Sequence, residues 1–244
     1  MKKAVATPSN SFRFKQFEIH QDQCTMKVGT DGVLLGAWAD VSQSKRILDI
    51  GTGSGVIALM LAQRAQEADI HGVEIDPLAQ EQAAMNAEHS PWGERITIFP
   101  GAIQDFARQH QERYDLVVSN PPFFSGGTLS ANHSRNEVRH TVKLPSGELL
   151  HAVRMLLKPE GRFCVILPFL EGLRFAELAA SYNLPCTRMT EVFPKPSKPV
   201  SRLLLQFESE AHPLVKSKLM IQEVEEHNWT DEYKALTDQF YLDM

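Results

Sequence analysis

The amino-acid sequence predicts an α/β fold, with a mostly parallel sheet and helices on both of its faces. Short apolar runs rich in β-branched residues alternate with longer stretches of helical periodicity between Arg46 and Phe207. Strands that alternate with helices in this way imply parallel βαβ units, whose sheet is covered on both sides. The chain has 244 residues, of which 43% are hydrophobic and 23% are charged. It is therefore long enough for one large domain with a substantial core.

Seven strands are expected in this sheet. The connection 194–199 between the last two is short, whereas a parallel crossover needs about a dozen residues or more. The last strand is therefore expected to be antiparallel. The expected strands lie at 47–50, 70–75, 96–99, 116–118, 163–167, 189–193 and 202–207, and the expected helices between them at 56–68, 78–87, 148–157 and 169–181.

Two further segments lie outside this series. Residues 27–38 indicate a glycine turn, a helix cap at Thr30 or Asp31, and an amphipathic helix that packs on the sheet. Near the end of the chain, Thr230 followed by two acidic residues predicts the N-cap of a helix that runs to about Phe240. Residues 1–11 are polar and are expected to be flexible.

The composition excludes several classes of protein. Three cysteines at distant positions and no C-x-x-C pair argue against a disulfide framework and against structural zinc, so no metal site is expected. The basic start of the chain is not followed by the apolar run of a secretory signal, and no apolar stretch approaches the roughly 18 residues of a membrane span. A soluble cytoplasmic protein is expected, with no obligate protein partner.

A glycine-rich loop, residues 51–55, follows the first expected strand and opens a helix. Glycines allow positive φ and close approach of a ligand, and a helix N-terminus supplies unpaired N–H groups. Alone, the loop is also consistent with a tight turn that binds nothing. Glu74, at the end of the next strand, adds a carboxylate that can accept hydrogen bonds from both ribose hydroxyls. Together they predict a site for a nucleoside cofactor.

The spacing of the glycines distinguishes two such cofactors. The loop reads GxGxG, whereas dinucleotide-binding loops read GxGxxG, and Asp49 just ahead of it would repel a pyrophosphate but suit a sulfonium or ammonium charge. Residues 48–55 and 73–76 resemble the nucleotide half of the class I S-adenosylmethionine-dependent methyltransferases, which implies a Rossmann-like fold. The resemblance makes S-adenosylmethionine the expected cofactor, with Asp49, Gly51, Thr52, Gly53, Gly55, Glu74 and Ile75 as binding residues.

The motif Asn120-Pro121-Pro122-Phe123 follows the fourth strand. Alone it could be a plain turn, but after the glycine loop it resembles the (N/D/S)PP(Y/F) motif of methyltransferases that modify planar nitrogens. The lone pair of such an amine is delocalised into its ring. If the Asn120 side-chain oxygen and the Pro121 carbonyl each accept one N–H, the amine can aim its lone pair at the methyl donor. The prolines fix the backbone, and Phe123 supplies a stacking face for the base.

The resemblance extends from about residue 12 to residue 207. The segment with Thr30 and Asp31 is similar to the cofactor-closing segment, here residues 12–45, of the bacterial family that methylates adenine N6 just 3′ of the anticodon in a valine tRNA. That family would place both residues near the methionine end of the cofactor. Many class I enzymes have an acidic residue after the glycine at the third strand, whereas this chain has Ala102 and Ile103, which are expected to contact adenine by backbone and apolar surface.

Positive charge is concentrated in one part of the chain. The whole chain has a net charge of −5, yet residues 123–207 carry eleven basic and six acidic side chains, while residues 208–244, an expected acidic helical tail, carry three and nine. Basic side chains near a target-base motif favour RNA phosphates over a plain solvated surface. The expected RNA-binding residues are Arg135, Arg139, Lys143, Lys195, Lys198 and Arg202.

Transfer of a methyl group to adenine N6 in tRNA is the leading hypothesis. The same motif also resembles those of ribosomal-RNA guanine-N2 and protein-glutamine methyltransferases, because amides and exocyclic amines pose the same geometric problem. The positive charge of residues 123–207 favours nucleic acid over protein, and the choice of adenine over guanine rests on the resemblance. An RNA-binding module that keeps the cofactor fold without catalysis is the alternative from another class.

Overall fold

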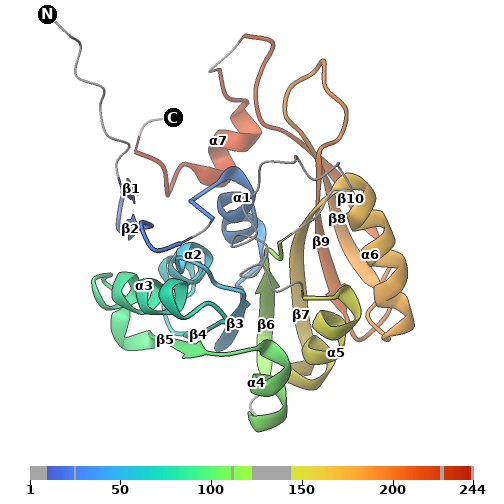
Figure 1. Cartoon of the computed structure of the whole chain (residues 1–244). Helices are drawn as coiled ribbons and strands as arrows, with labels where there is room; N and C mark the ends of the chain where they lie inside the picture. The colour runs from blue at the N-terminus through green and yellow to red at the C-terminus, as the bar shows by residue number, and fades with distance from the viewer. Residues whose placement is uncertain (1–9, 25, 111–112, 123–143, 226–227, 243–244) are drawn as a thin grey trace, which may run out of the picture.

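In the computed structural model, residues 10–24, 26–110, 113–122, 144–225 and 228–242 are described, and within them the main sheet has eight strands. Their spatial order is β10-β8-β9-β7-β6-β3-β4-β5 (Figure 1). The strands are β3 (Arg46–Ile50), β4 (Asp69–Glu74), β5 (Ile96–Pro100), β6 (Tyr114–Ser119), β7 (Leu157–Pro168), β8 (Cys186–Phe193), β9 (Arg202–Glu208) and β10 (Val215–Met220).

The pairing of the strands confirms a mostly parallel sheet. The strands from β5 to β7 pair in parallel, and β10 pairs in parallel with β8. The expected antiparallel strand is β9, which lies between β7 and β8 and runs opposite to both. All seven expected strands are present.

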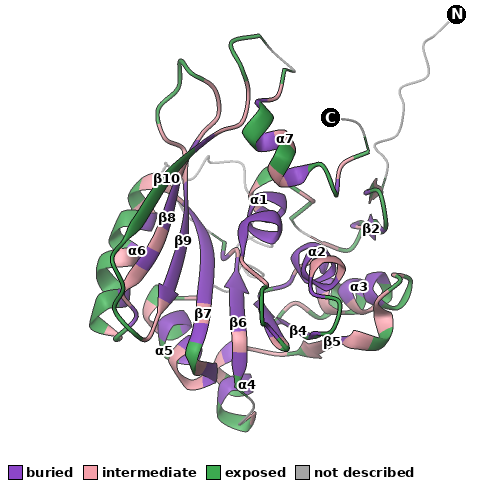
Figure 2. Cartoon of the chain, turned by 180° about the vertical axis from the view of Figure 1, so that it is seen from behind, coloured by how far each residue is buried: buried purple, intermediate pink, exposed green. Residues whose placement is uncertain are grey.

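The expectation of seven strands was wrong, because the sheet has an eighth strand, β10. The expectation of a helical tail was wrong for the same reason, because β10 lies in that tail. Figure 2 shows β10 as an exposed edge strand, whereas β9 and β7, further into the sheet beyond β8, are buried. Lys216, Ser217 and Lys218 are exposed along it. An edge strand that faces water needs no apolar run, and lysines protect such an edge from further pairing, so the hydrophobic pattern gave no signal for it.

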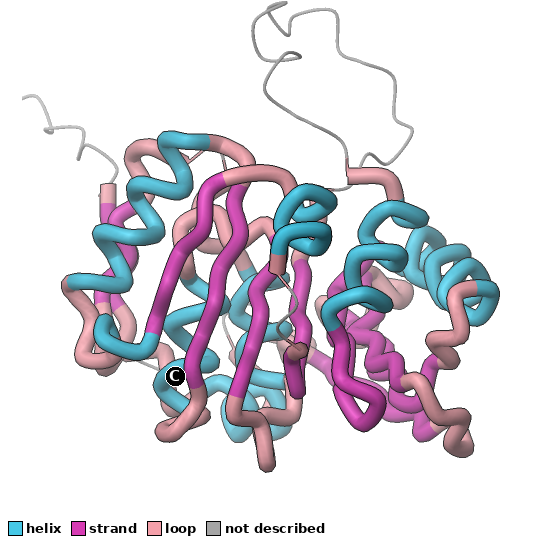
Figure 3. Tube along the Cα trace, turned by 90° about the horizontal axis from the view of Figure 1, so that it is seen from below, coloured by secondary structure: helices cyan, strands magenta, loops and turns pink. Residues whose placement is uncertain are grey.

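Helices cover both faces of the sheet (Figure 3). Side chains alternate between the two cores along each strand, as Leu116 and Val118 of β6 pack in one core and Val117 in the other. The first core includes residues of α1 (Thr30–Trp38), α2 (Val56–Arg64), α3 (Pro77–Glu88) and α7 (Asp231–Thr237), and the second includes residues of α4 (Ile103–Gln109), α5 (Ser146–Leu156) and α6 (Phe169–Ser181).

A small hairpin and one short helix complete the described chain. Strands β1 (Ser11–Arg13) and β2 (Glu18–His20) form a separate antiparallel pair, and a 3₁₀ turn, η1 (Gly93–Arg95), precedes β5. Phe14 and Phe17 of the hairpin stack with centroids 4.6 Å apart inside the first core. None of the described helices combines the length and apolar character needed to cross a membrane.

The ends of the helices agree only in part with the sequence. Thr230 caps α7 as predicted, since its side chain accepts a hydrogen bond from the Tyr233 N–H, but the helix ends at Thr237. The predicted cap of α1 was wrong, because its N-cap is Gly29 and no side chain caps it. Nor is α1 amphipathic: it is buried continuously from Gly32 to Trp38, since it is enclosed by α2, α7 and the sheet.

Candidate active site

One cavity of about 1720 Å³ lies along the carboxyl ends of the parallel strands. Its wall combines the start of α1 with the segments that follow β3, β4, β5 and β6, where an open parallel sheet is expected to bind its ligands. The structure thus brings together segments that are far apart in the sequence. The predicted site residues on this wall are Thr30, Asp31, Gly51, Thr52, Gly53, Glu74, Ile75, Ala102, Ile103, Asn120, Pro121, Pro122 and Arg202.

The glycine loop leaves open space where a ligand could approach the backbone. Gly51 and Gly53 have φ of +70° and +57°, and a Cβ added to either would meet no atom within 4 Å. Gly55 differs: it is the N-cap of α2 with φ of +83°, and its Cβ would contact Leu59 and Ala83. The first two glycines therefore shape the cavity wall, whereas Gly55 starts and packs the helix.

Glu74 is fixed by the backbone of two loops. Its Oε2 accepts a hydrogen bond from the Gly53 N–H at 2.8 Å, and its Oε1 accepts one from the Asp76 N–H at 2.9 Å. A carboxylate oxygen has two lone pairs, so both oxygens can still accept a hydrogen bond from a ligand. Asp76, the last residue of the segment 73–76, also lines the cavity and caps α3 through the Leu78 N–H at 2.9 Å.

Asp49 lies beneath the glycine loop and is fully buried. Its Oδ2 accepts a hydrogen bond from the Thr52 hydroxyl at 2.6 Å, and among the described residues its Oδ1 has no partner. Burial, with a further contribution from the charge of Glu74, raises the pKa of Asp49 to about 7. Asp49, which was expected to bind the cofactor, is therefore not part of the cavity wall.

The end of β6 carries an amide oxygen that has no partner among the described residues. Ser119 donates a hydrogen bond from its hydroxyl to the Ile50 carbonyl at 2.9 Å, which ties β6 to the end of β3. The next residue, Asn120, has a buried Oδ1 that accepts no hydrogen bond from any described residue. Buried polar atoms are almost always paired in proteins, so an unpaired acceptor on a cavity wall is expected to bind a donor group of a ligand. Phe123 lies outside the described residues.

Comparison with known proteins identifies the family. A tRNA1(Val) (adenine(37)-N6)-methyltransferase of Trichodesmium erythraeum is 46% identical over 96% of this chain and 98% of its own. Relatives with the same name are 46% identical in Dyadobacter fermentans and 44% identical in Actinobacillus succinogenes, over 96% of this chain and at least 98% of theirs. The chain belongs to the tRNA1(Val) (adenine(37)-N6)-methyltransferase family.

Two broader comparisons agree with this membership. The family model of the methyltransferase small domain matches residues 26–167. Among solved structures, a predicted O-methyltransferase of Agrobacterium tumefaciens superposes with a TM-score of 0.66 at 19% identity, over 86% of this chain and 96% of that one. Similarity at this level of identity shows the fold alone, and the fold is that of a Rossmann-like class I methyltransferase.

In this member of the family, the cavity wall fits S-adenosylmethionine. The space beside Gly51 and Gly53 is open, and the Glu74 carboxylate keeps lone pairs for hydroxyl groups. Ala102 and Ile103 follow Gly101, whose N–H donates to the Glu74 carbonyl at 2.8 Å, so they lie close to Glu74 along the same wall. The wall thus offers acceptors and apolar surface of the kind that an adenosine needs.

Two acidic side chains of the site have basic partners. Asp31, in the first turn of α1, accepts a hydrogen bond on Oδ2 from the Arg202 Nε at 2.8 Å. Arg202 was predicted to bind RNA, and the pairing between two predicted ligand residues was missed because they are 171 positions apart. Asp105, in the first turn of α4 after the third expected strand, lines the cavity and forms an ion pair with Arg108.

The remaining basic residues divide into two groups. Lys198 is exposed in a turn that its N–H closes onto the Lys195 carbonyl at 2.9 Å, in the loop between β8 and β9 whose ends, Pro194 and Ser201, line the cavity. This loop follows the carboxyl end of β8 (Figure 1). Arg135, Arg139 and Lys143 lie outside the described residues.

Proposed function

We propose that this chain transfers a methyl group from S-adenosylmethionine to N6 of the adenine at position 37 of a valine tRNA. The observation that carries the proposal is the unpartnered Oδ1 of Asn120 on a cavity wall shared with the glycine loop and Glu74. A buried acceptor of this kind suits an amine N–H. The family relatives bear this activity in their names.

The donor would be held by the loops after β3, β4 and β5. Glu74 accepts the two ribose hydroxyls, Gly51 to Gly53 admit the ligand close to the backbone, and Ala102 with Ile103 contact the adenine ring. Thr30 and Asp31 would lie at the methionine end. S-adenosylmethionine supplies a methyl group that its positive sulfur has already activated, so the task of the protein is to position the acceptor.

The acceptor amine would be positioned by Asn120 and Pro121. The Asn120 Oδ1 and the Pro121 carbonyl each accept one N–H of the amine, which frees its lone pair to point toward the methyl group. Phe123 would stack on the base, an interaction worth about 1 to 3 kcal/mol. Residues 12–244 would then act as one methyltransferase domain, with residues 12–45 closing over the cofactor.

The basic residues beside the motif would bind tRNA phosphates. Arg135, Arg139, Lys143, Lys195 and Lys198 supply charge that a polyanion requires, and a cytoplasmic location follows from the substrate. Changing Arg135, Arg139, Lys195 and Lys198 to Ala should weaken tRNA binding and lower the slope of log affinity against log salt by nearly one for each phosphate that is no longer neutralised. Unchanged affinity and slope would remove this assignment.

Methyl transfer from labelled S-adenosylmethionine to total bacterial tRNA tests the whole proposal. After nuclease digestion, the label should be found in N6-methyladenosine. Label in ribosomal-RNA guanine or in a protein fraction would keep the chemistry of Asn120 and replace the substrate. Tight binding of tRNA without any transfer would instead indicate an RNA-binding module that has kept the cofactor fold.

A further inference from the structure

Arg202 and Asp31 connect the two walls of the cavity. Both residues line it, Asp31 from the first turn of α1 and Arg202 from the first position of β9. The Nε of Arg202 donates to Oδ2 of Asp31 at 2.8 Å, and the two side chains are only 34% and 26% exposed. The pair therefore joins the start of α1 to the start of β9.

The backbone of Arg202 is held on both sides. Arg202 pairs with Pro168 of antiparallel β7 and with Val192 of antiparallel β8, so it lies in the interior of the sheet although it begins a strand. Its Nη1 also donates to the Ser201 carbonyl at 3.1 Å. A guanidinium with a fixed backbone and two hydrogen-bond acceptors has a defined orientation.

Asp31 does not cap its own helix. The N-cap of α1 is Gly29, and the helix start has no side-chain cap. The carboxylate is thus available for Arg202 and for a ligand, and the ion pair fixes which oxygen faces each. Lys198, in the same β8–β9 loop, is exposed instead, which is the arrangement that a phosphate contact requires.

We propose that Arg202 is a positioning residue that holds Asp31 toward the methionine end of the methyl donor, and is not a phosphate-binding residue. This inference rests on the proposed function. It assigns Arg202 to donor binding and leaves tRNA binding to the exposed Lys198 of the same loop. Because the guanidinium acts through Asp31, its contribution should vanish when Asp31 is changed.

A double-mutant cycle measured by calorimetric binding of S-adenosylmethionine tests this assignment. Arg202→Gln and Asp31→Asn should each raise the Kd about tenfold, and the double variant should bind no more weakly than Asp31→Asn alone. Arg202→Lys, which keeps the charge and a donor, should recover part of the affinity. The salt dependence of tRNA binding should be unchanged in Arg202→Gln, whereas Lys198→Ala should lower its slope.

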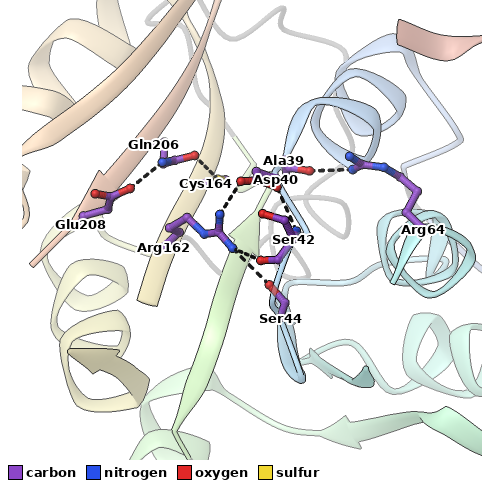
Figure 4. Close-up of polar contacts among 9 residues, drawn as sticks. All are labelled: Ala39, Asp40, Ser42, Ser44, Arg64, Arg162, Cys164, Gln206 and Glu208. Carbon is purple, nitrogen blue, oxygen red and sulfur yellow. Dashed lines mark hydrogen bonds and ion pairs between the residues drawn. The ribbon is translucent and has the colours of Figure 1, made fainter. Parts of the chain in front are cut away.

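The chain offers a matched control at the other end of α1. Arg162 of β7 forms an ion pair with Asp40, donates to the Ser42 carbonyl at 2.6 Å, and lies outside the cavity wall (Figure 4). Arg162→Gln breaks an arginine–aspartate pair of the same kind, so it should lower the melting temperature and leave the donor Kd unchanged.

Four outcomes would overturn the inference. They are an unchanged donor Kd in Arg202→Gln, additive effects in the double variant, a salt slope that falls by about one in Arg202→Gln, and equal weakening of donor binding by Arg162→Gln. If the unmodified chain does not bind S-adenosylmethionine, the proposed function fails and this inference fails with it. If the unmodified chain does bind S-adenosylmethionine, any of the four outcomes overturns the role of Arg202 alone and leaves the proposed function standing.

Discussion

The two ends of strand β6 carry similar side chains that differ in their hydrogen bonding: one is fully paired and the other is not. At the amino end, Asp115 accepts hydrogen bonds from the backbone N–H groups of Lys45 and Arg46, at 3.0 and 2.9 Å, and from the Lys158 Nζ at 2.7 Å. At the carboxyl end, the buried Oδ1 of Asn120 accepts no hydrogen bond from the described residues. Paired groups stabilise the fold, whereas an unpaired buried group costs free energy that a ligand can recover.

The same contrast separates the two edges of the sheet. At the amino edge, Asp40 is paired with Arg162 and accepts a hydrogen bond from the Ser42 N–H at 2.9 Å. At the carboxyl edge, Asp49 is fully buried, and its Oδ1 has no partner within the described part of the chain. The difference indicates that the amino edge stabilises the fold and the carboxyl edge binds ligands. Substitutions at the amino edge should therefore lower stability, and substitutions at the carboxyl edge should lower activity.

The largest effect should come from Asn120→Ala. Loss of the amide oxygen removes one of the two acceptors proposed for the amine, so turnover should fall by a factor of about 10² to 10³. The donor Kd should change little, because the donor is assigned to other loops. The free energy of unfolding should be unchanged or slightly higher, since an unpaired buried polar group is removed.

Single-turnover methyl transfer and calorimetric donor binding, measured on the same preparation, separate these effects. Ser119→Ala is a suitable control, because it removes the hydrogen bond to Ile50 at the neighbouring position without touching the proposed acceptor. Ser119→Ala should lower the free energy of unfolding and have little effect on turnover. Nearly normal turnover in Asn120→Ala would contradict the positioning of the amine.

A smaller effect, on donor binding, is expected from Glu74→Ala. The substitution removes the acceptor of the proposed ribose hydroxyls and also the support of the Gly53 and Asp76 N–H groups. Hydrogen bonds to a charged group contribute about 1.5 to 3 kcal/mol, so the donor Kd should rise about 10- to 100-fold. Glu74→Gln, which keeps one oxygen acceptor, should be less impaired. Equal Kd values in the unmodified chain and Glu74→Ala would exclude Glu74 from the site.

Asp49 should make donor binding depend on pH. Burial raises the pKa of its carboxyl to about 7, so the group gains its negative charge as the pH rises through that value. The ionised form attracts a cationic donor, and donor affinity should therefore increase by up to about tenfold between pH 6 and pH 8. In Asp49→Asn this increase should be absent, although the Asn oxygen can still accept the hydrogen bond from Thr52.

The stability of the free protein should show the opposite trend with pH. Because the folded pKa of Asp49 lies above the ordinary value of about 3.9, the folded state binds more protons than the unfolded state between these values. This contribution to the free energy of unfolding is lost as the pH rises from about 4 to about 7. A pH profile of donor binding that is identical in the unmodified chain and in Asp49→Asn would contradict the assignment.

The sequence predicted the carboxyl edge well because its signals are local. Gly51, Gly53, Glu74 and Asn120 each lie at or just after a strand end, and a parallel sheet brings such ends to one edge. What the sequence could not predict depends on the order of the strands. Arg202 reaches Asp31 because β9 is inserted between β7 and β8, a placement that no local pattern in the chain encodes.

The position of Asp49 outside the cavity wall illustrates a second limit. Its position ahead of the glycines predicted a charge near the donor, but alternation along β3 directs the side chain below the loop, on the face that carries α2. Similarly, the exposed lysines of β10 concealed an edge strand within an acidic tail. In both cases the residue type alone did not predict the structure, because the place of the residue depended on how the strand lies in the sheet.

The smallest effect on binding should come from Asp115→Ala, which tests the amino edge directly. Partial burial opposes ionisation of Asp115, but hydrogen bonds from Lys158 and from the Arg46 and Lys45 N–H groups outweigh it and lower the pKa of the carboxyl. The substitution leaves these donors without their acceptor, so the free energy of unfolding should fall by about 1 to 3 kcal/mol at neutral pH.

A carboxyl with a lowered folded pKa stabilises the protein above its unfolded pKa of about 3.9 and loses that contribution as the pH falls through the folded value. The difference in urea-induced unfolding between the two proteins should therefore shrink below about pH 4, while the donor Kd at neutral pH stays unchanged. A donor Kd that rises in Asp115→Ala as much as in Glu74→Ala would mean that the two edges are not separate, because damage to the stabilising edge would then reach the binding edge through β6.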